Sequence, residues 1–93
     1  MTFQERLQRL LHHGNLTIAD LARWLDRPHP TVSGWVKFGK EPGSGPLDAA
    51  MVYAQVAALE KLLKKKRGLP IPRLSPQARI EHLLHLKKQR LRD

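Results

Sequence analysis

The chain has 93 residues and no cysteine, and its 17 lysines and arginines against 8 acidic residues give a formal net charge of +9. This length allows one small core with an appendage and leaves no room for a large enzyme. The absence of cysteine excludes disulfides and thiolate metal sites, so burial of apolar side chains and oligomerisation must supply stability. The positive charge is typical of a protein that binds a polyanion.

The charge is unevenly distributed along the chain. Residues 1–63 contain 7 basic and 6 acidic side chains, whereas residues 64–93 contain 10 basic and 2 acidic ones. We therefore divide the chain into a folded domain at 1–67 and a basic spacer with a C-terminal helix at 68–93. A solvated basic tail is the alternative interpretation of the second part.

No segment is predicted to span a membrane. The two longest apolar windows, residues 47–63 and 80–91, are interrupted by acidic, amide and basic side chains. Residues 1–6 lack the charged-then-apolar order of a secretory signal. We therefore expect a cytoplasmic location, which is the host cytoplasm if the source is viral.

Two helices are predicted in the first 25 residues. Thr2 can cap the first helix, and Gly14 and Asn15 can end it. Thr17 can cap the second helix, with Asp20 in its first turn, where the helix dipole favours an anion. The apolar stripes at helical spacing are Phe3, Leu7, Leu10 and Leu11, and then Ile18, Leu21, Ala22 and Leu25.

A short third helix and a long fourth helix follow. Pro30 suits the first turn of the third helix, because its missing N–H would be unpaired there. Residues 39–46, with three glycines and two prolines, are predicted as a loop. A helix rich in alanine, leucine and lysine then runs from about Leu47 to about Arg67 and ends at Gly68. The residues that follow helical spacing are Thr31, Val32, Trp35, Val36 and Phe38 in the third helix, and Val52, Val56, Leu59 and Leu63 in the fourth.

Residues 69–76 contain three prolines and are predicted to form a semi-rigid extended spacer. Ser75 as N-cap and Pro76 at the first helical position then open a last helix. Its apolar side should contain Ile80, Leu83, Leu84 and Leu91, and its polar side Arg79, Lys87, Lys88, Arg90 and Arg92. The predicted fold is all-α, with three short helices, a long fourth helix, a proline-rich spacer and a basic C-terminal helix.

Residues 16–35 carry a pattern of short blocks, which are Leu16-Thr17, Leu21-Ala22, Leu25 and Thr31-Val32-Ser33-Gly34-Trp35. This pattern resembles the helix-turn-helix of the Cro and phage-repressor type. The resemblance implies a DNA-binding domain at 1–67 whose third helix is the recognition helix. The sequence differs from the family at Asp26, where the turn usually has glycine, and at Arg27, where an apolar residue is usual.

The small side chain of Ala22 allows the third helix to cross close above it, with Val32 and Trp35 pressed inward. The resemblance implies that the outward-facing side of the third helix contacts bases and phosphates. This side has no arginine, asparagine or glutamine that could make bidentate contacts with bases. Phosphates should then supply much of the affinity, partly through a second basic cluster. The candidate DNA-binding residues are Thr17, His29, Pro30, Thr31, Ser33, Gly34, Lys37 and Lys40, with Lys64, Lys65, Lys66 and Arg67 in the cluster.

Other site chemistry is weakly indicated. His82 and His85 lie three residues apart on the last helix, but no suitable third metal ligand accompanies them. The acidic residues are scattered, and no nucleophile, base and orienting group occur at a recognisable spacing. The glycine-rich segment 39–45 follows a helix and not a strand, which argues against a nucleotide-binding loop. We expect neither enzyme activity, nor a metal, nor a cofactor.

The sequence therefore predicts a protein that binds double-stranded DNA, most simply a small phage- or bacterial-type transcriptional regulator acting as a dimer. The alternative is a small terminase subunit, or another DNA-packaging or architectural protein, that binds viral DNA as a larger ring. RNA is less favoured, because no aromatic stacking platform is evident. Contacts between subunits are expected from the long helix, at Leu59, Leu62 and Leu63, and from the C-terminal helix. The latter could dock on its own body, swap onto a neighbour or become ordered only with a partner.

Overall fold

The computed structural model describes residues 1–43 and 45–92, with side chains described up to residue 89 apart from the gap. All the regular structure in these residues is helical, which confirms the predicted all-α fold. The side chains of Arg90, Leu91 and Arg92, which the sequence assigns to the two sides of the last helix, lie outside the described residues. The helices are α1 (Phe3–His13), α2 (Ile18–Leu25), α3 (His29–Phe38), α4 (Pro46–Lys65) and α5 (Pro76–Arg92).

Local capping sets where α1 and α2 begin. The hydroxyl of Thr2 accepts a hydrogen bond from the backbone N–H of Glu5, and the Glu5 carboxylate accepts one from the backbone N–H of Thr2. Thr17 and Asp20 form the same reciprocal pair at α2. Each box satisfies two N–H groups that have no partner inside the helix, so the helix starts predicted from the sequence are confirmed.

The turn between α2 and α3 is made without glycine. Asp26 closes α2 in the left-handed conformation, with φ of 54°, which short polar side chains tolerate better than most residues. The neighbouring Arg27 donates hydrogen bonds to the carbonyls of Leu25 and Asp26 and forms an ion pair with Asp48 of α4. The two departures from the family pattern thus have structural roles, since one supplies the turn and the other ties it to α4.

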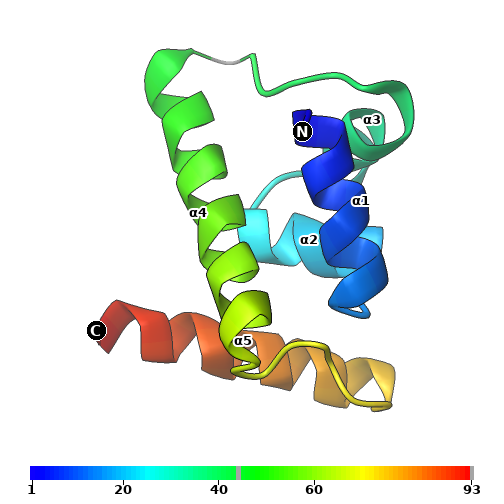
Figure 1. Cartoon of the computed structure of the whole chain (residues 1–93), viewed down its shortest axis with the longest axis vertical. Coiled ribbons are helices and arrows are strands. Elements are labelled where there is room, and N and C mark those ends of the chain that lie inside the picture. Colours follow the sequence, from blue (N-terminus) through cyan, green and yellow to red (C-terminus); the bar gives the residue numbers. More distant parts are fainter. Residues whose placement is uncertain (44, 93) are drawn as a thin grey trace.

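The first four helices enclose one apolar core. α1 packs on α3 and α4, and α2 packs on α3, α4 and α5 (Figure 1). Trp24, whose environment the sequence left open, is buried and donates its indole N–H to the carbonyl of Gln55 in α4 at 3.1 Å. The residues with 0% exposure are Leu7, Leu21, Leu25, Val32, Val52, Val56 and Leu59.

The proline-rich segment adds two residues to this core. Leu69 and Ile71 are each 2% exposed. The backbone N–H of Ile71 donates to the carbonyl of Gly14 at 2.9 Å, and the side-chain amide of Asn15 donates to the carbonyl of Ile71 at 2.7 Å. These bonds fasten the segment to the turn after α1, so the predicted spacer is packed against the domain.

α5 docks on the body of its own chain, one of the three arrangements that the sequence left open (Figure 1). Leu83 and Leu86 are buried, whereas Leu84 is 51% exposed, so the prediction that Leu84 faces inward is wrong. The orientation of α5 is set instead by a contact between Leu86 and Gly68, which periodicity within the helix does not reveal. Leu86 lies so close to Gly68 that a side-chain carbon at Gly68 would come within 2.5 Å of it, which fixes the rotation of α5.

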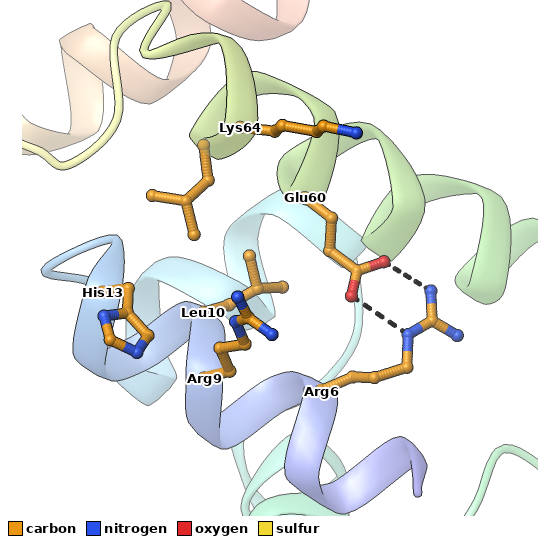
Figure 2. Close-up of a pocket in the computed structure, with 7 residues that line it drawn as sticks. Arg6, Arg9, Leu10, His13, Glu60 and Lys64 are labelled. Atoms are coloured by element: carbon orange, nitrogen blue, oxygen red, sulfur yellow. Dashed lines mark hydrogen bonds and ion pairs between the residues drawn. The ribbon is translucent and has the colours of Figure 1, made fainter. Parts of the chain in front are cut away.

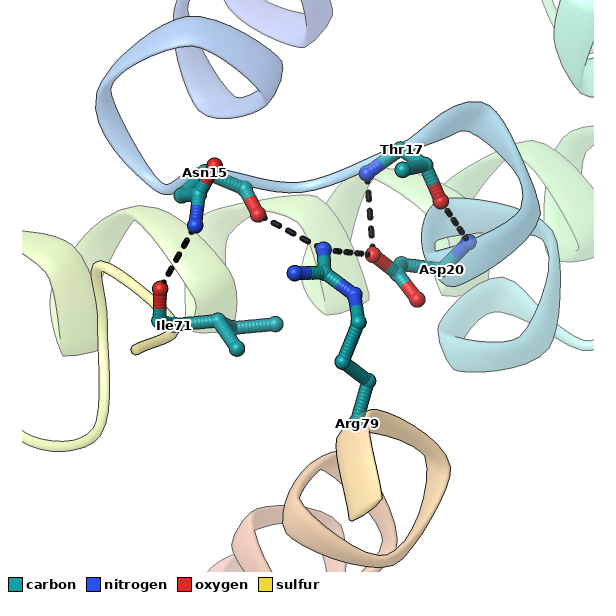
Figure 3. Close-up of polar contacts among 5 residues, drawn as sticks. All are labelled: Asn15, Thr17, Asp20, Ile71 and Arg79. Carbon is teal, nitrogen blue, oxygen red and sulfur yellow. Dashed lines mark hydrogen bonds and ion pairs between the residues drawn. The ribbon is translucent and has the colours of Figure 1, made fainter. Parts of the chain in front are cut away.

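Two residues assigned to the polar side of α5 hold the helix in place. Lys87 donates to the carbonyl of Trp24 at 2.9 Å, at the C-terminal end of α2, where a cation is favoured by the helix dipole. Arg79 donates to the Asp20 carboxylate and to the carbonyl of Asn15, at 2.6 and 2.7 Å (Figure 3). Asp20 is only 3% exposed, so Arg79 compensates a charge that would otherwise be buried alone.

We expect Arg79→Ala to lower the free energy of unfolding by about 3 kcal/mol, because it strands the buried carboxylate of Asp20. Urea denaturation followed by circular dichroism measures this loss. Lys88→Ala is the matched control, since Lys88 lies on the same helix and is exposed. Equal losses in the two variants would contradict a special role for Arg79.

The same carboxylate should make stability sensitive to acid. Burial raises the pKa of Asp20, but hydrogen bonds from Arg79 and Thr17 outweigh burial and hold the pKa below its ordinary value of 3.8. A lowered pKa in the folded state means that the stabilisation is complete at neutral pH and is lost as pH falls through the lowered value. The difference in unfolding free energy between the wild type and Asp20→Asn should therefore shrink below about pH 4. A difference that stays constant down to about pH 2 would contradict this assignment.

Candidate nucleic-acid interface

α3 has one face fixed in the core. Val32, Trp35 and Val36 are 0%, 5% and 6% exposed, which confirms the prediction that Val32 and Trp35 point inward. Ala22 of α2 is also buried, at 8% exposure, in the same core. The helix begins after Pro28 and has Pro30 in its first turn, as expected from the sequence.

α1 fixes the position of α3 from the other side. The side-chain amides of Gln4 and Gln8 both donate to the carbonyl of Val36, at 3.0 and 3.1 Å. A carbonyl near the end of a helix has no partner inside the helix, so these two bonds satisfy it and restrain the last turn of α3. The outer face of α3 therefore belongs to a helix that α1 holds in place.

The outer face contains most of the residues predicted for it. His29, Pro30, Thr31 and Lys37 are exposed, and Ser33 is half-buried. Lys40 is exposed just beyond the helix. This face carries the cations of Lys37 and Lys40 and the hydrogen-bonding groups of His29, Thr31 and Ser33. We call these six residues, His29, Pro30, Thr31, Ser33, Lys37 and Lys40, the α3 surface.

Two residues of α3 differ from the sequence prediction. Gly34 was expected to face outward, but it is buried, with the aliphatic part of the Lys40 side chain next to it. The chain turns back after Gly39, whose φ is 69°, and this brings Lys40 against α3. Phe38 was placed in phase with the core, yet it is 76% exposed, because it is the last residue of α3 and lies outside the inward-facing arc of Val32, Trp35 and Val36.

Thr17 serves first as a helix cap. Its hydroxyl accepts from the backbone N–H of Asp20, at 3.1 Å. The residue is nevertheless exposed at the N-terminal end of α2, where unpaired N–H groups and the helix dipole favour an anion. The phosphate contact expected from Thr17 stays a prediction.

The cluster Lys64–Arg67 lies apart from the α3 surface. All four side chains are exposed, and Lys66 closes α4 in the left-handed conformation. Figure 1 places this end of α4 beside α5 and well away from α3. The predicted DNA-binding residues therefore fall into two separate positive zones and not into one patch.

Lys64 also lines a groove between α1 and α4 with a volume of about 560 Å³ (Figure 2). Arg6 at this groove forms two hydrogen bonds with Glu60, at 3.1 and 2.6 Å, which raise the pKa of Arg6 and neutralise the carboxylate. Arg9 contributes a further positive charge to the groove. Sequence reasoning missed Arg6 and Arg9, because α1 was considered only as a core helix. Their signal was a spacing of three residues, which puts both on one side of a helix.

In comparisons with known proteins, no family model, no curated protein and no solved structure matches the chain. Across the described part of the chain, no helix is both long and apolar enough to cross a bilayer. The same residues contain no group of three or more acidic, histidine or cysteine side chains placed to hold a metal. The interpretation of the site therefore depends on its own residues.

The orientation of α3 can be tested by stability alone. Trp35→Ala removes a buried aromatic side chain and should cost about 3–5 kcal/mol of unfolding free energy. Phe38→Ala alters an exposed residue and should change it by less than about 0.5 kcal/mol. Chemical denaturation of both variants compares them directly. A large loss for Phe38→Ala would mean that α3 is rotated from the orientation described above.

Proposed function

We propose that the protein binds double-stranded DNA through the α3 surface, with α3 in the major groove. The observation that supports this is a helix held rigidly on one side by Val32, Trp35 and the two glutamines of α1, while its other side is polar and positive. A helix of this kind fits the width of the major groove. Rigid support matters, because a contact residue must be held in place to bind tightly.

The chemistry of the α3 surface favours phosphate over base recognition. Lys37 and Lys40 can pair with phosphates, and Ser33, Thr31 and His29 can form single hydrogen bonds with either phosphates or base edges. The bidentate side chains that distinguish bases most strongly are missing from this surface. We therefore propose moderate sequence preference with a steep dependence on salt, as expected where phosphates dominate the affinity.

The most economical role is a small transcriptional regulator, in line with the resemblance of residues 16–35 to repressor-type domains. The weak base-reading chemistry also fits a packaging or architectural protein, which needs less discrimination between sequences. The ratio of affinities for a selected and a random duplex separates the two roles. A ratio of about 10³ or more supports the regulator, and a ratio near one supports the architectural role.

The two positive zones should contribute differently to DNA binding. Lys37→Gln should weaken binding several-fold and reduce the salt slope by about one, because a phosphate contact of the α3 surface is lost. Replacing Lys64, Lys65 and Lys66 together by glutamine should flatten the salt slope with less effect on sequence preference. Fluorescence anisotropy with a labelled duplex at several salt concentrations measures both quantities.

Lys88→Gln is the control for overall charge, since it removes one positive charge from an exposed position on α5. If Lys37→Gln and Lys88→Gln weaken binding equally, the effect is one of net charge and the α3 surface is not the site. Unchanged affinity in Lys37→Gln and in the triple variant would remove both zones from the proposal.

A further inference from the structure

The groove between α1 and α4 is lined by cations from both helices. Its volume of about 560 Å³ lies within the range of about 300–1,000 Å³ that is typical of small-molecule sites. Along α1, Arg6, Arg9 and His13 are three and four residues apart, so they share one side of the helix. Glu60 and Lys64 line the groove from α4. We call this space the α1–α4 groove.

The floor of the α1–α4 groove is closed by packing within the chain. Leu10 is 1% exposed, and Leu63 packs against the core. The sequence suggested Leu59, Leu62 and Leu63 for subunit contacts, but Leu59 is fully buried and the other two pack against the core of their own chain. The groove is therefore formed by a single chain, and a ligand can occupy it without a second copy.

Glu60, the carboxylate that lines the groove, is fully used by Arg6. Its two oxygens accept hydrogen bonds from the Arg6 guanidinium, at 3.1 and 2.6 Å. Neither Arg9 nor Lys64 forms an ion pair among the described side chains. Figure 2 shows Arg9 extending from α1 between His13 and the ion pair. Three permanent cations thus accompany one carboxylate, which leaves an excess of two positive charges in the groove.

The helix ends beside the groove do not consume these cations. At the end of α1, the backbone N–H of Gly14 donates to the carbonyl of Leu10 at 2.8 Å. At the end of α4, the backbone N–H of Arg67 donates to the carbonyl of Leu62 at 3.0 Å. Backbone groups thus satisfy carbonyls that a cationic side chain could otherwise cap. The cations of the groove remain available to an anion from outside the chain.

We propose that the α1–α4 groove binds a phosphate monoester, held by Arg9 in a bidentate contact and by Lys64 as a point charge. A monoester carries between about −1.5 and −2 charges at neutral pH, which matches the excess of two positive charges. A backbone diester or a carboxylate carries one charge and would leave one cation without a partner. A free nucleotide and the 5′-phosphate at the end of a DNA strand both present this group.

Adenosine monophosphate (AMP) is the probe, and two-dimensional NMR of the full chain without DNA is the measurement. Titration of the wild type should shift the side-chain N–H signal of Arg9 and the backbone signals of His13 and Lys64 until they saturate. Adenosine, which lacks the phosphate, should leave these signals unchanged. Shifts that do not saturate with AMP, or equal shifts with adenosine, would overturn the proposal.

Arg9→Gln removes the anchoring guanidinium and should raise the dissociation constant for AMP by about tenfold or more, as expected when a charge-assisted hydrogen bond is lost. Arg23→Gln is the matched control, since it removes the same charge from an exposed arginine of α2 that does not line the groove. Arg9 is exposed too, so both variants should fold, and unchanged circular dichroism spectra check that they do. An equal loss in the two variants would mean that net charge alone attracts the nucleotide, and the site would be disproved.

A duplex with 5′-phosphates and the same duplex with 5′-hydroxyls distinguish the two sources of the group. Tighter binding of the phosphorylated duplex that is lost in Arg9→Gln identifies the strand end as the ligand. Equal binding of both duplexes while AMP stays in the groove identifies the free nucleotide. If the hydroxyl duplex displaces AMP as well as the phosphorylated one does, the groove takes backbone diesters and the monoester assignment is wrong. Because the AMP titration contains no DNA, its result is independent of the proposed DNA binding.

Discussion

The buried carboxylate of Asp20 joins the two parts of this structure. It closes the capping box at the start of α2 and accepts a charged hydrogen bond from Arg79 of α5 (Figure 3). A carboxylate that is 3% exposed has to be compensated fully, because an unpaired buried charge would cost several kcal/mol. The buried carboxylate at the start of α2 requires a cation, and Arg79, 59 residues later, supplies it only if α5 lies beside α2.

This constraint acts indirectly on the proposed DNA surface. α2 is held between α4 and α5 by Trp24, Asp20 and Lys87, and α3 packs on α2 and α1. With α2 fixed, burial of Val32 and Trp35 leaves α3 only one rotation. The outward direction of the α3 surface is therefore set by contacts made on the opposite side of the domain. A small basic protein can in this way present a rigid helix without a large core.

Local signals in the sequence predicted the helices well, and distant contacts explain what they missed. Thr2, Thr17 and Ser75 mark helix starts through bonds to residues three positions away, which a sequence displays directly. The burial of Ile71 and the role of Arg79 depend on partners more than fifty residues away. Periodicity could not reveal these partners, since it reports that a face is apolar or polar and not what lies against it.

The site shows the same division. Val32 and Trp35 were predicted to be buried from their spacing, and this is confirmed. Gly34 was misplaced, because the loop that brings Lys40 over it has no periodic pattern. Arg6 and Arg9 were missed because they belong to a positive groove that forms only where α4, with Lys64, lies beside α1. The positive charge thus lies in two zones, around α3 and at the C-terminal end of α4, and only the packing of the helices reveals that they are separate.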